Sequence, residues 1–294
     1  MNESVSKNKT SARKLLQFVA KVTVTLICFW YISLKINFSE IATALQKANW
    51  WWLSFAIFFF ALGKLFASFR LNIYFKNITL SISQFQNIKL YWLGMFYNLF
   101  LPGSISGDAY KVILLARKKI ASYKKITTAV LLDRFSGLLA LNLFLAVYGL
   151  IVLKNNNHIA FLFAIALGCI CGLYIVVRYF LKDFLSGLFH TFIWGIAVQL
   201  MMLFAIYSIM LSLHLPLLQS EWVFIFLIAS VVSVLPISLG GGLGTREVVF
   251  MSCANYFGID MHIGIIISLL FYLSNLIASI GGLYFVFNDP LKEK

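Results

Sequence analysis

Five ionisable residues lie within strongly apolar stretches of the sequence, where side chains of this kind are costly. They are Asp108, Asp133, Arg134, Arg246 and Glu247. In a membrane, such groups face the protein interior, pair with one another and mark paths for ions or substrates. Arginine can hold a phosphate through parallel hydrogen bonds, and a carboxylate can orient the arginine. We therefore treat these five residues as candidates for a binding site.

Four of the five candidates form two pairs of adjacent residues, Asp133 with Arg134 and Arg246 with Glu247. Neighbours on a helix point about 100° apart, so neither couple can pair well within itself. We expect pairing between elements, with Asp133 facing Arg246, and Arg134 facing Glu247 or Asp108. The alternative is a static ion network that only holds the helices in place.

Glycines adjoin these charges. Gly103 and Gly107 flank the first site, and Gly240, Gly241, Gly242 and Gly244 precede the last one. Glycine permits tight turns and leaves backbone N–H groups open to a ligand, and a helix start favours an anion there. The simpler alternative is capping, with Asp108 and Thr245 as N-caps and Glu247 as a first-turn acid.

Long apolar segments must position these residues. The chain has 294 residues, of which 61% are hydrophobic and 12% charged, whereas soluble domains average about 45–50% and about 25%. We therefore predict an all-α polytopic membrane protein. Six segments are long enough to cross a bilayer, namely 15–34, 50–70, 126–153, 159–178, 191–213 and 262–287.

Two further apolar segments, 85–101 and 222–235, end in Leu-Pro and lead into the glycine-rich stretches. A helix of their length covers only about 22 Å, so each must turn inside the membrane. We predict re-entrant hairpins at 85–118 and 222–257. The repeated order of span, span, hairpin, span predicts two copies, 15–153 and 159–287. The odd number of crossings in each copy makes the second inverted, as in many transporters.

Basic residues indicate which span ends face the cytoplasm. With the N-terminus inside, the cytoplasmic segments, Arg70 among them, contain 16 Lys and Arg, and the outer segments contain 3. We expect a basic cytoplasmic N-terminus at 1–14 and a cytoplasmic tail at 288–294. The basic stretch from Lys111 to Lys125 is expected to lie on anionic inner-leaflet lipids. Lys64, near a span end, is expected to snorkel.

Several functional classes are disfavoured. The net charge of +14 invites a nucleic-acid partner, but the basic residues fall between apolar spans. We expect no metal and no cofactor, since the four cysteines and four histidines are dispersed along the chain without ligand spacing. We expect no catalytic residues, because neither Gly-x-Ser-x-Gly nor His-Glu-x-x-His occurs.

Three motifs, GDAYKVILLARKK from Gly107, VLLDRFSGLLAL from Val130 and LPISLGGGLGTREVVF from Leu235, resemble the membrane domain of bacterial lysylphosphatidylglycerol synthases. The resemblance covers about residues 10–288. It implies a lipid flippase in the bacterial cytoplasmic membrane, and we expect a standalone form without the soluble aminoacyltransferase domain. The matching site residues are Gly107, Asp108, Asp133, Arg134, Gly244, Arg246 and Glu247. Many relatives have an arginine where this chain has Tyr272.

We therefore expect a translocase for a phospholipid or a lipid-linked headgroup, such as aminoacyl-phosphatidylglycerol or a polyprenyl-linked group. The site would comprise the charged residues with Lys111, Gly241 and Gly242, and the arginines would hold the phosphate. Alternatively, the chain is a membrane-embedded transferase, with Asp133 or Glu247 as the base. It could also be a membrane subunit or scaffold of a separately encoded transferase.

Overall fold

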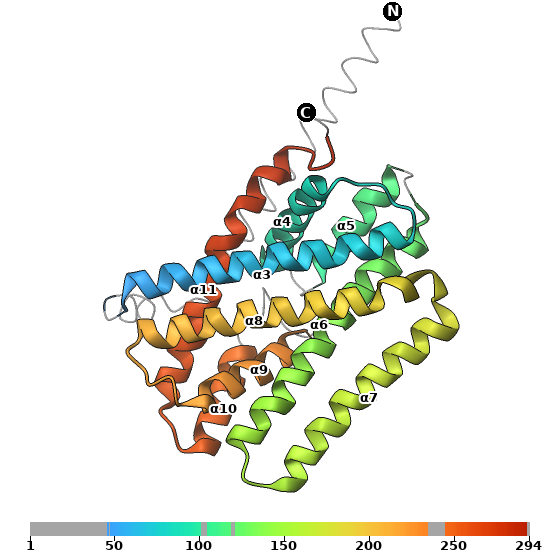
Figure 1. The fold of residues 1–294 in the computed structure, drawn as a ribbon. Coiled ribbons are helices and arrows are strands. Elements are labelled where there is room, and N and C mark those ends of the chain that lie inside the picture. Colours follow the sequence, from blue (N-terminus) through green and yellow to red (C-terminus); the bar gives the residue numbers. More distant parts are fainter. Residues whose placement is uncertain (1–45, 47, 101–104, 119–120, 235–244, 293–294) are drawn as a thin grey trace, which may run out of the picture.

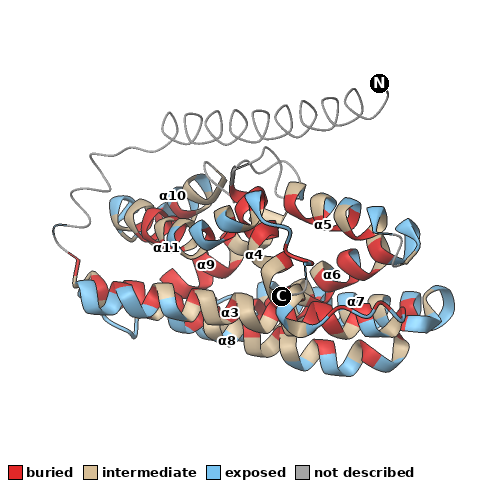
Figure 2. Cartoon of the chain, turned by 90° about the horizontal axis from the view of Figure 1, so that it is seen from above, coloured by how far each residue is buried: buried red, intermediate tan, exposed pale blue. Residues whose placement is uncertain are grey.

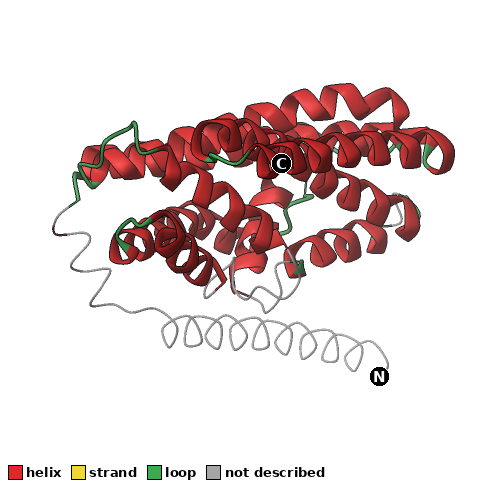
Figure 3. Cartoon of the chain, turned by 90° about the horizontal axis from the view of Figure 1, so that it is seen from below, coloured by secondary structure: helices red, strands yellow, loops and turns green. Residues whose placement is uncertain are grey.

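A computed structural model describes residues 46, 48–100, 105–118, 121–234 and 245–292 of the chain (Figure 1). All regular structure in these residues is helical (Figure 3). The helices long and apolar enough to cross a membrane are α3 (Trp50–Asn77), α6 (Tyr123–Val152), α7 (Asn156–Phe180), α8 (Leu188–Ser212) and α11 (Met261–Phe287). The expected class, an all-α polytopic membrane protein, is confirmed. The predicted span 15–34 and the tail 1–14 lie outside the described residues.

Two pairs of shorter helices occupy the positions of the predicted hairpins. They are α4 (Gln84–Phe100) with α5 (Ser106–Arg117), and α9 (Ser220–Val234) with α10 (Thr245–Phe257). In each pair the two helices pack against one another. The connections at 101–104 and 235–244 lie outside the described residues, and with them Gly103, Gly240, Gly241, Gly242 and Gly244.

Local sequence explains where most of the long helices begin. Asn49, Ser122, Asn155 and Asp260 precede α3, α6, α7 and α11, and each side chain accepts a hydrogen bond from a backbone N–H of the first turn. Caps of this kind satisfy donors that the helix itself leaves unpaired. Before α8, the short 3₁₀ helix η1 (Lys182–Gly187) continues the chain from α7.

The helices form two layers (Figure 2). In one layer α3 and α8 pack along each other, with α7 beside them; in the other lie the short helices α4, α5, α9 and α10. Helix α4 packs on α11, and α9 packs on α6. Gly282 of α11 permits the first of these contacts, because a Cβ there would lie 2.3 Å from the Trp92 carbonyl oxygen of α4.

Helix α7 packs mainly on α6 and on η1, and most of its surface is exposed. Its apolar residues therefore face the membrane. Cys169 and Cys171 lie on this helix and are exposed, so they are not part of the protein core.

The structure corrects two predicted boundaries. Helix α3 continues to Asn77 instead of ending near residue 70, and Arg70 is buried. The stretch from Lys111 to Lys125 is not one surface element, because α5 ends at Arg117 and α6 begins at Tyr123. Lys111 is buried, whereas Lys125 is exposed and pairs with Asp183 of η1 at 3.1 Å.

Candidate functional site

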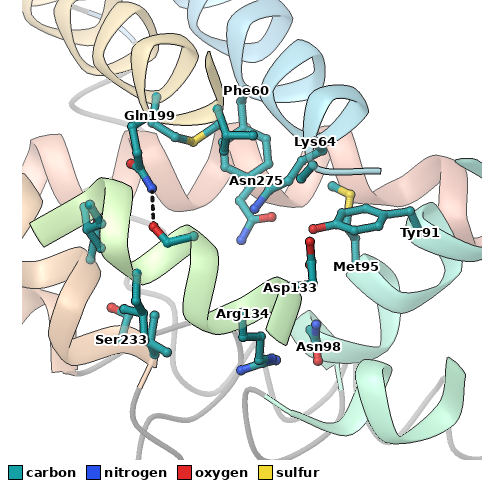
Figure 4. Close-up of a pocket in the computed structure, with 18 of the residues that line it drawn as sticks. Phe60, Lys64, Tyr91, Met95, Asn98, Asp133, Arg134, Gln199, Ser233 and Asn275 are labelled. Carbon is teal, nitrogen blue, oxygen red and sulfur yellow. Dashed lines mark hydrogen bonds between the residues drawn. The ribbon is translucent and has the colours of Figure 1, made fainter. Parts of the chain in front are cut away.

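A polar cavity of about 290 Å³ lies between α3, α4, α5 and α6 on one side and α8, α9, α10 and α11 on the other. Figure 4 shows side chains from these helices directed into it, among them Lys64, Asn98, Asp133, Arg134 and Asn275. Aromatic and aliphatic side chains such as Phe60 and Met95 complete the wall. The cavity thus combines an apolar lining with a few converging charged groups, which is typical of ligand sites.

Asp133 of α6 pairs with Arg70 of α3. The Arg70 Nε lies 2.7 Å from the Asp133 Oδ1, and the two side chains are 6% and 8% exposed. The predicted pairing of Asp133 with Arg246 is therefore wrong. The prediction failed because Arg70 was assigned to a cytoplasmic loop, whereas α3 carries it into the protein.

Asp108 of α5 holds two cations at once. Its carboxylate accepts a hydrogen bond from Lys111 Nζ at 2.9 Å and another from Arg134 Nε of α6. One of the two partners predicted for Arg134 is thus confirmed. Asp108 is not an N-cap, since Ile105 precedes the helix and Asp108 lies in its first turn. Lys111 Nζ also lies over the Tyr91 ring, 4.1 Å from the centroid.

Gly107 brings the start of α5 against α4. A Cβ at Gly107 would lie 1.9 Å from the Gly94 carbonyl oxygen, so only glycine permits this approach. The Gly107 N–H donates to the Asn98 Oδ1 at 2.8 Å. The expectation that this N–H is open to a ligand is therefore wrong, and Gly107 instead permits the close approach to α4 of the turn that carries Asp108.

Arg246 of α10 contacts a hydroxyl and an aromatic ring, whereas Arg70 and Arg134 pair with carboxylates. Its Nε donates to the Ser233 Oγ of α9 at 3.0 Å, and its guanidinium lies over the Phe271 ring, 4.5 Å from the centroid. Glu247 lies in the first turn of α10, as predicted, and accepts a hydrogen bond from the Ser268 hydroxyl at 2.8 Å. Arg246 lines the cavity, whereas Glu247 does not belong to its wall.

Lys64 of α3 also lines the cavity, with its Nζ 4.9 Å from the centroid of the Phe60 ring. The expectation that it snorkels to the membrane surface is wrong. Asn98, Gln199 and Asn275 are further lining residues that were not predicted. The available signal was their polarity within apolar spans, because a polar side chain in a membrane helix faces the protein interior.

Tyr272, at the position where the resemblance implies an arginine in many relatives, does not line the cavity. It is buried in an apolar cluster with Leu93, Phe96 and Leu99. Its hydroxyl has no hydrogen-bond partner among the described residues. Tyr272 therefore contributes to the packing between α4 and α11 and adds no group to the cavity wall.

Comparison with known proteins gives a family for this architecture. The family model of the lysylphosphatidylglycerol synthase TM region matches residues 18–190. The chain is also 24% identical over 135 residues to a UPF0104 membrane protein of Pyrococcus horikoshii, and the aligned part covers 45% of this chain and 39% of that protein. No solved structure matches the chain. Asp108, Asp133 and Arg134 fall within the family match, whereas Arg246 and Glu247 follow it.

Proposed function

Because the chain belongs to the family of the lysylphosphatidylglycerol synthase TM region, we propose that this multi-pass membrane protein is a translocase. It moves a phospholipid or lipid-linked headgroup between leaflets. The observation that carries the proposal is the charged cavity, whose wall combines residues of α3 to α6 with residues of α8 to α11. A site between two halves of a membrane protein can open to either side when the halves rock.

Helix packing supports an inverted repeat of the two halves. The contact of α4 with α11 corresponds to that of α9 with α6, and α4 with α5 corresponds to α9 with α10. Likewise α5 packs on α6 as α10 packs on α11. In this proposal the short helix pairs enter the membrane and return to the same side, with both termini cytoplasmic in a bacterial cytoplasmic membrane.

In this proposal the arginines bind the headgroup and the carboxylates orient the arginines. Arg134 and Arg246 reach the cavity from α6 and α10 and hold the phosphate of the headgroup, while its acyl chains stay in the bilayer. Asp108 orients Arg134, and Asp133 orients Arg70. Outside the cavity, exposed Lys124 and Lys125 at the start of α6 contact anionic lipids of the inner leaflet.

Leaflet exchange in proteoliposomes tests the proposal. The native protein is expected to accelerate exchange of some headgroup-labelled lipids over protein-free vesicles. Asp133→Asn and Arg246→Ala are expected to slow it about tenfold or more, since a hydrogen bond to a charged group contributes about 1.5–3 kcal/mol. Asp183→Asn is the control, because it breaks an exposed ion pair whose two residues do not line the cavity.

Folded protein that exchanges no lipid faster than protein-free vesicles would refute the translocase. Lipid mass spectrometry on expressing cells distinguishes the remaining functions. A new lipid species that depends on Asp133 would favour a transferase, and an unchanged lipid composition with intact binding of a separate transferase would favour a scaffold.

A further inference from the structure

The cavity wall carries more positive than negative charge. Its charged lining residues, within the described part of the chain, are the cations Lys64, Arg70, Lys111, Arg134 and Arg246 and the carboxylates Asp108 and Asp133. Five cations thus face two carboxylates. In a membrane this is unfavourable, because buried charges are stable only when they are paired and hydrogen-bonded.

The ion pairs show where the compensation is incomplete. Asp133 compensates Arg70, and Asp108 is shared between Lys111 and Arg134. Among the described residues, Lys64 and Arg246 form no ion pair with a carboxylate. These two cations instead lie over the rings of Phe60 and Phe271.

Glu247 does not remove the excess. It attracts Arg246 electrostatically, but its carboxylate accepts from Ser268 and does not belong to the cavity wall. Counting it with Asp108 and Asp133 would still leave two positive charges uncompensated.

Arg70, which belongs to the cavity wall, also has one nitrogen without a hydrogen-bond partner among the described residues. Arg70 is 5% exposed, and its Nη1 has no hydrogen-bond partner in the described part of the chain. A buried donor without an acceptor costs free energy. That nitrogen is itself closed to the cavity, so the uncompensated cations are what favour a ligand, one that brings several acceptor oxygens and more than one negative charge.

From these observations, and resting on the translocase function, we propose that the headgroup is a terminal phosphate, either a phosphomonoester or a diphosphate. A phosphomonoester carries about −1.5 to −2 at pH 7 and three acceptor oxygens. A phosphodiester lipid carries a single negative charge and leaves the excess uncompensated. A cationic aminoacyl headgroup brings an ammonium among the five cations, which repel it.

The size of the cavity agrees with a small headgroup. Ligand sites span about 300–1,000 Å³, and this cavity, at about 290 Å³, is slightly smaller than that range. It accommodates a terminal phosphate while the hydrocarbon of the lipid remains in the bilayer. Phosphatidic acid and polyprenyl phosphate or diphosphate belong to the proposed class.

Binding to the purified, full-length protein in detergent tests this class separately from transport. Native mass spectrometry compares phosphatidic acid and polyprenyl phosphate with phosphatidylglycerol, phosphatidylcholine and lysylphosphatidylglycerol. The two terminal phosphates are expected to bind at least about tenfold more tightly than the others, because each added charged hydrogen bond contributes about 1.5–3 kcal/mol.

A matched pair of lysine variants locates the binding. Lys64→Met removes an uncompensated cation from the cavity, whereas Lys89→Met removes a lysine that also lies over a phenylalanine ring, at 4.4 Å, but does not line the cavity. Lys64→Met is expected to reduce the preference for terminal phosphates about tenfold, and Lys89→Met to leave it unchanged. Equal effects of the two variants would overturn the proposal.

The remaining outcomes separate the two proposals and the two sources of phosphate. Exchange of phosphodiester or cationic lipids, with no preference for terminal phosphates, would overturn the headgroup class and leave the translocase standing. Tight binding of terminal phosphates without exchange would support the headgroup class and refute the translocase. Binding of inorganic phosphate or pyrophosphate as tight as that of the lipids would overturn a lipid ligand in favour of a soluble anion.

Discussion

Removing one partner of the ion pair between Arg70 and Asp133 should destabilise the protein far more than removing both. The pair joins α3 to α6, and its side chains are 6% and 8% exposed. Arg70→Met leaves the carboxylate of Asp133 buried and uncompensated, which costs about 3–5 kcal/mol. Asp133→Leu leaves the guanidinium in the same position, and we expect a loss of similar size.

The double variant, Arg70→Met with Asp133→Leu, replaces both charges with apolar side chains. Replacing a buried ion pair in this way is often close to neutral, so we expect its free energy of unfolding to lie within about 1–2 kcal/mol of the native value. The coupling energy between the two sites is then several kcal/mol. Circular dichroism in mixed micelles of dodecylmaltoside with increasing sodium dodecyl sulfate measures these unfolding free energies.

The exposed pair of Lys125 with Asp183 provides the matched control. Both of its side chains are more than half exposed, and a pair of this kind contributes about 0–1 kcal/mol. The same cycle on this pair should therefore give little coupling. A double variant at Arg70 and Asp133 as unstable as the sum of its single variants would refute the argument, because the buried charges would then not depend on one another.

Three further predictions concern packing, pH and topology. Gly107→Ala should lower the free energy of unfolding by about 1–3 kcal/mol, because its Cβ would overlap a carbonyl oxygen of α4, whereas Gly168→Ala, where a Cβ meets open space, should not. Burial alone would raise the pKa of Asp289, but hydrogen bonds from Lys118 and a backbone N–H lower it. Its small stabilising effect should thus be present above about pH 4 and be lost as the pH falls through the lower folded-state pKa, and Asp289→Asn should remove this dependence in unfolding measurements. Cysteines introduced at Asn156, the first residue of α7, and at Asp183, in η1 after α7 ends, should react with impermeant reagents from opposite sides of the membrane, and labelling of both from one side would contradict the topology.

The sequence predicts the membrane-spanning elements well, because span length and apolarity are local properties. The spans predicted at 126–153, 159–178, 191–213 and 262–287 correspond to α6, α7, α8 and α11. The end of α3 was misplaced by seven residues because Arg70 looks like a charge at a membrane surface. Only the packing of α3 against α6 reveals that this arginine is buried beside a carboxylate.

Partner choice within the site could be predicted only in part. Helical geometry excludes pairing between Asp133 and Arg134, and it left Asp108 as one of two candidates for Arg134. The pairing of Arg134 with Asp108 depends on how α5 packs on α6, and α5 also approaches α4 closely where Gly107 meets Gly94. Such a contact depends on the relative placement of two helices, which no pattern along the chain encodes.

Asp108 both connects two helices of the site and binds two of its cations. Its carboxylate joins the first turn of α5 to Arg134 of α6 and also holds Lys111. A motion that separates α5 from α6 therefore takes the carboxylate of Asp108 away from Arg134, whereas Lys111 stays beside Asp108 because both lie on α5. A phosphate that enters the cavity can take the place of this carboxylate beside Arg134, because it brings oxygens and negative charge. An anionic ligand can thus stabilise a separated arrangement of the helices that is unfavourable in its absence, and this differential stabilisation is what a ligand must provide to drive a conformational change.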